Sequence, residues 1–249
     1  PRVLWERVYP PDDRNRILLG LNALLVRTPE ANVLVDTGIG TKWSDRELEM
    51  YGIAHETTVP DSLESLGLTV DDIDVVVCTH LHFDHAGGNT VNSDGQAVPQ
   101  FPNARYLVSR SEFEHAERPH ERDRASYLPD NWRPMQASGQ LELMPDAYEP
   151  VEGLRIETFR GHSETMQTVR LDRGGRTLYG FADLVPTRHH LSPAWIAGFD
   201  LYPVETLEFK KRTLPMAVDE GWECLFYHDI EASLCSLHRE NGKIVFSKI

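Results

Sequence analysis

The stretch Thr79-His80-Leu81-His82-Phe83-Asp84-His85-Ala86-Gly87-Gly88-Asn89 decides how this sequence is interpreted. It places three of the chain's 11 histidines and one carboxylate within six residues, His80 to His85. Imidazole nitrogens and carboxylate oxygens are the normal ligands of zinc, and a tight loop of alternating ligands can present them to two positions. Gly87 and Gly88 indicate a close-packed turn directly after the ligands. The stretch therefore predicts a metal site rather than a polar loop with coincidental histidines.

Strand-like apolar runs lead into this stretch and into three further candidate ligands. The run 73–78 is almost continuously apolar, as expected of a strand covered on both faces, and ends before His80. Three more pairs of strand and candidate ligand follow, namely 154–159 before His162, 177–181 before Asp183 and 224–227 before His228. If these strands share one sense, their ends meet at one edge of a sheet, where functional loops commonly lie. We therefore expect one site built from four segments.

The other local patterns indicate an α/β protein with one domain over residues 1–249. Runs 22–26 and 32–35 predict a hairpin that ends at the turn signal Asp36-Thr37-Gly38. The predicted helices are one with a capping box at Ser44 and Glu47, one with a capping box at Ser111 and Glu114, one over 61–66, and one over 204–218 that Pro215 kinks or ends early. The segment 118–140 reads as a long loop that is either disordered or part of a binding site.

The composition argues against nucleic-acid and membrane partners. The formal net charge is −14, from 39 acidic and 25 basic residues, and would repel a phosphate backbone. The densest basic run, 210–212, lies in a predicted helix and is expected to be a solvated face. No apolar run is long enough to span a bilayer, so a soluble, cytoplasmic protein is the expectation. Cys78, Cys224 and Cys235 form no close pair and are expected to be buried.

The stretch 79–89 resembles the signature of the metallo-β-lactamase superfamily. Phe83 and Gly87-Gly88-Asn89 in particular resemble its quorum-quenching N-acyl-homoserine lactonase branch. The other positions of the family pattern are filled in chain order by Asp36, Gly161-His162, Asp183 and His228. The resemblance extends from Asn22 to His228, and it implies the superfamily's αββα sandwich, in which two mixed sheets are flanked by helices.

The resemblance also implies a dinuclear zinc site. One ion would be held by His80, His82 and His162, the other by Asp84, His85 and His228, and Asp183 would bridge the two ions. Asp36 would lie outside the ligand set as a hydrogen-bond partner. Zinc is favoured, although such ligands also accept manganese, iron or cobalt. His82 stands where flavodiiron redox members carry Glu, which favours hydrolysis over redox chemistry.

The activity that the resemblance implies is hydrolysis through a metal-bridging hydroxide, with Asp84 and Asp183 as catalytic residues. Asp84 is either a proton shuttle to the leaving group or purely a ligand. A lactonase that opens acyl-homoserine-type lactones is the first expectation. Two departures matter, because the segment Gly161 to Met166 lacks the second His of the lactonase pattern, and Pro186 stands where the best-known lactonases have Tyr. A phosphotriesterase is therefore the alternative. A non-catalytic metal-binding module is least favoured, because every ligand position is filled.

The substrate is expected to be a small ester, lactone or phosphotriester. Its candidate contacts are Phe83, Met166, His190, Trp195 and Phe199, together with Tyr202, while Trp5 and Tyr127 are weaker candidates. Each apolar residue among them is as compatible with the core as with a pocket. His189 and His190 are interpreted either as a solvated pair or as a pair of which one member contacts substrate. The sequence leaves the oligomeric state open, with a homodimer as one option, as well as the acyl-chain preference and any residues upstream of Pro1.

Overall fold

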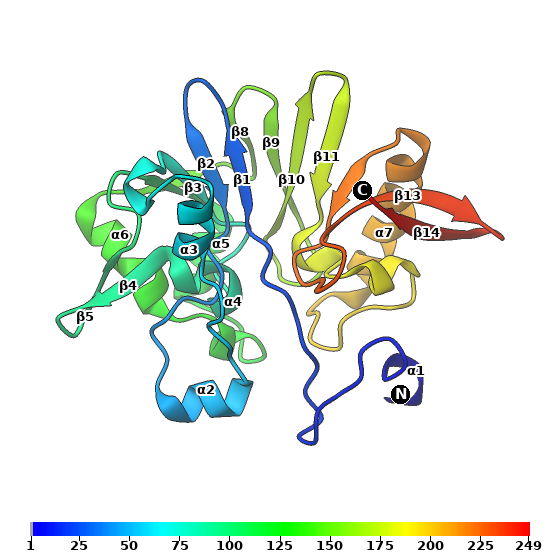
Figure 1. Cartoon of the computed structure of the whole chain (residues 1–249), viewed down its shortest axis with the longest axis horizontal. Coiled ribbons are helices and arrows are strands. Elements are labelled where there is room, and N and C mark those ends of the chain that lie inside the picture. The colour runs from blue at the N-terminus through cyan, green and yellow to red at the C-terminus, as the bar shows by residue number, and fades with distance from the viewer. Residues whose placement is uncertain (1) are drawn as a thin grey trace.

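Two β-sheets pack face to face at the centre of the molecule, and helices cover their outer faces (Figure 1). The computed structural model describes residues 2–249. The first sheet, in spatial order, consists of β1 (Leu24–Arg27), β2 (Asn32–Val35), β3 (Val75–Val77), β6 (Arg105–Ser109) and β7 (Leu141–Met144). The second consists of β14 (Lys243–Lys248), β13 (Leu234–Glu240), β12 (Glu223–Leu225), β11 (Arg176–Gly180), β10 (Met166–Arg173), β9 (Leu154–Phe159) and β8 (Ala147–Val151). A separate hairpin pairs β4 (Thr90–Ser93) with β5 (Gln96–Pro99).

Both sheets are mixed. In the first, β2, β3, β6 and β7 are parallel neighbours and β1 pairs antiparallel with β2 as the predicted hairpin. In the second, β11 and β12 are parallel and the other pairs are antiparallel. β2, β3, β9, β11 and β12 all direct their carboxyl ends toward the segments that carry the candidate ligands.

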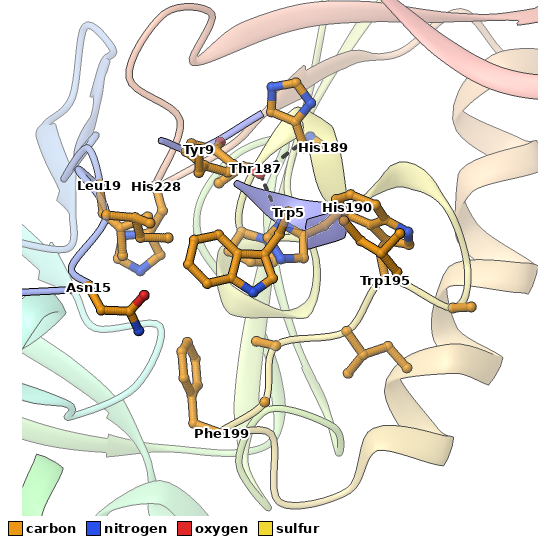
Figure 2. Close-up of a pocket in the computed structure, with 17 residues that line it drawn as sticks. Trp5, Tyr9, Asn15, Leu19, Thr187, His189, His190, Trp195, Phe199 and His228 are labelled. Carbon is orange, nitrogen blue, oxygen red and sulfur yellow. Dashed lines mark hydrogen bonds between the residues drawn. The ribbon is translucent and has the colours of Figure 1, made fainter. Parts of the chain in front are cut away.

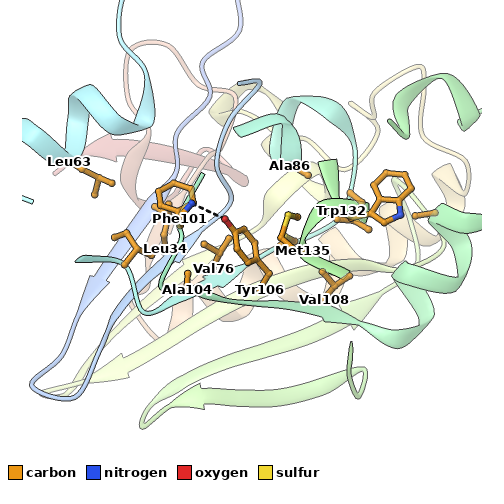
Figure 3. Close-up of a cluster of buried hydrophobic side chains, with 14 of the residues drawn as sticks. Leu34, Leu63, Val76, Ala86, Phe101, Ala104, Tyr106, Val108, Trp132 and Met135 are labelled. Carbon is orange, nitrogen blue, oxygen red and sulfur yellow. Dashed lines mark hydrogen bonds between the residues drawn. The ribbon is translucent and has the colours of Figure 1, made fainter. Parts of the chain in front are cut away.

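The core has three layers of apolar side chains. Between the sheets, Val33 and Val75 of the first sheet belong to one cluster with Ile156 and Val169 of the second. Outside the first sheet a second cluster contains Val76 of β3 (Figure 3). Val75 and Val76 point to opposite faces of β3, and both faces are covered by apolar clusters. This explains why β3 is apolar throughout. The third cluster packs α7 (Pro203–Asp219) onto the second sheet. The predicted αββα sandwich is thereby confirmed, and one domain over residues 1–249 stays a prediction.

The helix starts confirm one capping box and correct the other. The box of Ser44 and Glu47 opens α2 (Asp45–Tyr51) as predicted. The helix predicted at 61–66 is α3 (Val59–Ser65), which Thr58 caps. The box predicted at Ser111 was wrong, because α5 (Arg110–Glu117) begins directly after β6 and is capped by Ser109. The remaining helices are α1 (Arg2–Trp5), α4 (Phe83–Ala86) and α6 (Arg133–Ser138).

Three further expectations change in the structure. α7 runs through Pro215 to Asp219, so the early end did not occur. The segment 118–140 is not a plain loop, because it contains α6 and contributes the fully buried Trp132 to the core. In the basic run 210–212, Lys210 is 1% exposed, so a solvated face was wrong for this residue. Its ammonium group donates to the carbonyl oxygens of Ser192 and Trp195. These residues belong to the segment before α7, and this segment covers Lys210.

The expected burial of the cysteines is confirmed, because all three are buried. Within residues 2–249, no helix combines the length and apolar character needed to cross a membrane.

Candidate metal centre and adjoining cavity

The predicted ligands of both sheets come together at one end of the sandwich. His80, His82, Asp84 and His85 follow β3, while His162, Asp183 and His228 follow β9, β11 and β12. The ligand-type atoms of His80, His82 and His162 lie within 4.8 Å of one another, and so do those of Asp84, His85 and His228. These are the two sets that the sequence analysis assigned to two ions. A third group of the same kind joins His80 and His85 to Asp183.

Asp183 lies between the two histidine sets. Its Oδ2 is 3.4 Å from His162 Nε2, and its Oδ1 is 3.2 Å from His85 Nε2 and 3.2 Å from His228 Nε2. In addition, His82 Nδ1 is 3.1 Å from His162 Nε2. Ligand atoms that share one tetrahedral zinc ion at about 2.0–2.2 Å lie about 3.3–3.6 Å apart. The spacing of these side chains therefore fits metal ligands.

Buried ring nitrogens without partners give an independent test of this fit. Among residues 2–249, the Nε2 atoms of His80 and His85 and the Oδ1 atom of Asp183 are buried and have no hydrogen-bond partner. A buried polar atom without a partner normally costs stability. Three such atoms, on the side chains of one group of mutually close ligand atoms, fit a site that is completed by metal ions.

In His85, His162 and His228 the Nδ1 atom has a hydrogen-bond partner and Nε2 faces Asp183. Nδ1 of His85 donates to Asp36 Oδ2 at 2.9 Å, and Nδ1 of His228 donates to the Gly20 carbonyl at 2.9 Å. Nδ1 of His162 lies 3.1 Å from Asp200 Oδ1. Such partners fix the tautomer and orientation of metal-binding histidines. The expected role of Asp36 outside the ligand set agrees with this geometry.

The electrostatics keep part of the site in the form that binds metal. Burial, together with the neighbouring imidazoles, lowers the pKa of His80 and His82 well below the ordinary value. These rings are therefore neutral, with a lone pair available. Burial opposes ionisation of Asp183, but the three surrounding histidines outweigh it and lower the pKa of its carboxyl well below the ordinary value. Metal affinity requires these deprotonated forms.

Local backbone geometry explains why the loops pack so closely. A Cβ on Gly87 would lie 2.1 Å from the Ile39 carbonyl oxygen, and one on Gly88 would lie 2.1 Å from that of Thr37. Any residue larger than glycine at these two positions would therefore push the metal loop, residues 79–89, away from the chain that follows β2. Ala182, directly before Asp183, has a φ of 45°, a conformation that costs energy and is common at functional sites.

A cavity of about 520 Å³ adjoins the centre at His228 (Figure 2). Its wall comes from the N-terminal segment, which contributes Trp5 and Tyr9, and from the segment 186–199, which contributes Trp195 and Phe199. The ring of Phe199 also packs edge-on against His162. Among the described residues that line the cavity, none is Asp, Glu, Lys or Arg. The cavity therefore suits an uncharged, largely apolar group.

Comparison with known proteins agrees with the site. The sequence profile of the metallo-beta-lactamase superfamily matches residues 17–212. The chain belongs to this superfamily. A metallo-β-lactamase relative, the N-acyl homoserine lactonase AiiA of Bacillus thuringiensis subsp. kurstaki, is 27% identical over 219 residues, which are 83% of this chain and 80% of that protein.

Two solved structures have the same fold as this chain. A probable metal-dependent hydrolase from Staphylococcus aureus superposes with a TM-score of 0.89 at 30% identity, covering 100% of this chain and 90% of that one. AidC, described as a dizinc quorum-quenching lactonase in complex with a product, superposes with a TM-score of 0.76 at 21% identity, covering 93% of this chain and 80% of that one.

The candidate substrate contacts divide into two groups. His190, Trp195 and Phe199 line the cavity, and so do Trp5 and His189. The other candidates lie elsewhere, and Met166 is fully buried in the cluster under α7, where a substrate cannot reach it. Phe83 packs against Trp43 and Tyr51, Tyr127 packs against His82, and Tyr202 lies under the Arg160 guanidinium.

Three residues that support the metallo-β-lactamase site were missed by the sequence analysis. Asp200 holds His162, and Tyr227 stacks on the His85 ring at 3.9 Å while donating to the Asp84 carbonyl oxygen. Glu112, fully buried, accepts from the Leu81 backbone N–H at 2.7 Å and from the Thr165 hydroxyl. Of the three, only Tyr227 could have been suspected from the sequence, because it directly precedes the candidate ligand His228. Asp200 and Glu112 are distant in sequence from the groups they hold.

Proposed function

We propose that this protein is a dinuclear zinc hydrolase that opens lactones with an apolar substituent, with acyl-homoserine-type lactones as the expected class. The observation that carries the proposal is the uncharged cavity that meets the His and Asp centre at His228. The names of the relatives, a lactonase and a metal-dependent hydrolase, support the same class of reaction.

The seven ligand-type residues are assigned as in the family pattern. His80, His82 and His162 would hold one ion, Asp84, His85 and His228 would hold the other, and Asp183 would be shared between them. The three groups of mutually close ligand atoms support this division. When bound, two zinc ions activate water at neutral pH and polarise the carbonyl oxygen of the substrate.

The protein's own side chains supply proton transfer and selection. Asp84 is 26% exposed, whereas Asp183 is 4% exposed. This difference supports Asp84 as the group that carries a proton to the leaving alcohol, with a ligand role for its other oxygen, and Asp183 as a pure ligand. The apolar wall at Trp195 and Phe199 excludes water from the substituent and favours neutral substrates.

Phosphotriester hydrolysis is the second candidate. Pro186 lines the cavity at the position where the best-known lactonases carry a Tyr that assists the substrate carbonyl. A neutral triester also fits a wall without charged side chains. The same activated water can attack phosphorus in line.

A substrate panel with zinc-loaded protein tests these alternatives. The panel contains acyl-homoserine lactones, simple alkyl lactones, a paraoxon-like triester and a thioester, and we expect the highest kcat/KM for a lactone. Turnover of the triester alone would replace lactonase by phosphotriesterase. Metal analysis of the same preparation should find two ions per chain, and fewer than one ion would contradict the ligand assignment.

A further inference from the structure

Two histidines of the cavity wall, His190 and the metal-site residue His228, are oriented by hydrogen bonds, and His190 is the one outside the ligand set. It lies in the short 3-10 helix Arg188–Leu191, which Thr187 caps. The Thr187 hydroxyl oxygen is 2.8 Å from His190 Nδ1, and it also accepts from the His189 backbone N–H at 3.3 Å. Both Thr187 and His190 line the cavity (Figure 2).

The hydrogen bonds of Thr187 assign the tautomer of His190. Thr187 is fully buried, so its hydroxyl proton requires an acceptor within the protein. The acceptor that the structure offers is His190 Nδ1. The Tyr9 hydroxyl also interacts with the Thr187 side chain, but the two hydroxyls are not aligned as a hydrogen bond, and Tyr9 Oη has no partner among residues 2–249. With Nδ1 accepting from Thr187, neutral His190 carries its proton on Nε2, at the other edge of the ring.

The surroundings of His190 keep it uncharged. Burial, and secondarily the neighbouring Lys210 ammonium, lower the pKa of His190 to about 4. At neutral pH the ring is therefore a neutral N–H donor rather than a cation. In a wall that is otherwise mostly apolar, one such donor orients a ligand by its oxygen atoms.

We propose that His190 donates a hydrogen bond from Nε2 to a carbonyl oxygen of the bound substrate, and that Thr187 is the positioning residue that fixes this donor. The proposal rests on the proposed function and narrows the substrate class to neutral carbonyl compounds. It also supplies a polar contact that Pro186, with neither an N–H nor a polar side chain, cannot make. Because the donor is uncharged, carboxylate substrates gain no ion pair from it.

Paired variants of the zinc-loaded protein test the two roles. His190→Phe removes the donor and is expected to lower kcat/KM for lactones about tenfold, the size of one lost hydrogen bond to an uncharged partner. His190→Gln restores an N–H donor and should recover part of this loss. Thr187→Val keeps the shape of Thr187 without its hydroxyl, whereas Thr187→Ser keeps the hydroxyl. We expect a loss in the first and its rescue in the second.

Nitrogen NMR of the imidazole rings gives a readout that does not depend on turnover. In the wild-type protein we expect the proton of His190 on Nε2, whereas Thr187→Val should populate both tautomers. A lactam analogue, which keeps the carbonyl but resists hydrolysis, should shift the Nε2–H resonance. A proton on Nδ1 in the wild-type protein, no shift with the lactam, or unchanged kcat/KM in His190→Phe would overturn the proposal.

The same experiments separate failure of this proposal from failure of the proposed function. Absence of lactone and ester turnover in the wild-type protein would reject the function, while the tautomer and the lactam shift would still decide the role of His190. Lactone turnover with an unchanged His190→Phe variant would keep the function and reject the donor. If His190→Phe lowers kcat/KM for acyl-homoserine lactones alone, His190 contacts the carbonyl oxygen of their amide group. If it lowers kcat/KM equally for simple alkyl lactones, which lack that amide, His190 contacts the carbonyl oxygen of the lactone ring.

Discussion

Asp36 Oδ2 lies 2.9 Å from Nδ1 of His85, and both side chains are almost completely buried. The same carboxylate accepts from the Thr79 backbone N–H at 2.8 Å and from the Thr79 hydroxyl at 2.7 Å. The left-handed φ of 56° at Asp36 turns the chain at the end of β2. One side chain thus joins two neighbouring strands and orients His85 with its Nε2 toward Asp183.

Replacing Asp36 should weaken metal binding without removing a ligand. In Asp36→Asn the amide cannot accept every hydrogen bond that the carboxylate accepts, so His85 loses its fixed orientation. We expect a loss of about 10- to 100-fold in metal affinity, as for other partners of metal-binding histidines. Competition with a chromophoric chelator measures this affinity. Asp172→Asn, in the hairpin of β10 and β11, is the matched control, and equal affinities in the two variants would refute the role of Asp36.

Removing Asp183 should affect both ions at once. Its two oxygens face different histidine sets, His162 on one side and His85 with His228 on the other. Asp183→Ala is therefore expected to lower metal content at both positions and to abolish turnover. Elemental analysis after dialysis, combined with kcat for the best substrate, measures the two effects. If the variant kept two ions and normal turnover, Asp183 would not be a shared ligand.

The part of the site that the sequence predicted is the part encoded locally. A run of consecutive valines predicts a strand such as β3, and the first candidate ligand after each strand follows within a few residues. Strands that share one sense bring their ends to one edge, and the sequence analysis expected this of the strands before His80, His162 and His228. The sequence did not show that these strands belong to two sheets, with β3 in the first and β9 and β12 in the second.

The residues that sequence reasoning misplaced depend on distant contacts. Asp200 reaches His162 only because the chain before α7 folds back over the sheet end. Met166 looked like a pocket residue from its place beside His162, yet β10 turns it into the core. Ser109 and Ser111 both start a capping-box pattern, and the end of β6 decides between them. A basic run in a helix predicts an exposed face, and it gives no sign that the segment at Ser192 and Trp195 packs over Lys210.

Glu112 should prove structural, with its shape mattering more than its charge. Its carboxyl group joins the metal loop at Leu81 to Thr165 of the segment after His162. Burial raises the pKa of Glu112, which shows that the ionised form is disfavoured in the fold. Glu112→Ala leaves two buried donors without an acceptor and should lower the free energy of unfolding by about 3 kcal/mol. Glu112→Gln keeps an acceptor and should cost less.

Urea unfolding of the zinc-loaded variants measures this difference. Glu114→Ala is the matched control, because Glu114 lies on the exposed face of the same helix and should change the free energy of unfolding by less than about 0.5 kcal/mol. A loss in Glu112→Gln as large as that in Glu112→Ala would mean that the charge, and not the acceptor, is required.

Lys210 should give the stability of the protein an unusual dependence on pH. Burial lowers the pKa of Lys210 from 10.5 to about 8, while Nζ donates to the carbonyl oxygens of Ser192 at 2.7 Å and Trp195 at 2.6 Å. Below pH 8 the side chain is charged in the folded and the unfolded protein. Between pH 8 and 10.5 the unfolded chain holds more protons, so the free energy of unfolding contributed by this group rises with pH.

Comparing the wild-type protein with Lys210→Met isolates this contribution, because other titrating groups largely cancel in the difference. We expect the difference in the free energy of unfolding to shift in favour of the wild-type protein by up to about 3 kcal/mol between pH 8 and 10.5. Lys211→Met removes an exposed lysine from the same helix and should show no such slope. A flat difference for Lys210→Met would show that Lys210 keeps its ordinary pKa, and that the segment at Ser192 and Trp195 opens to water around it.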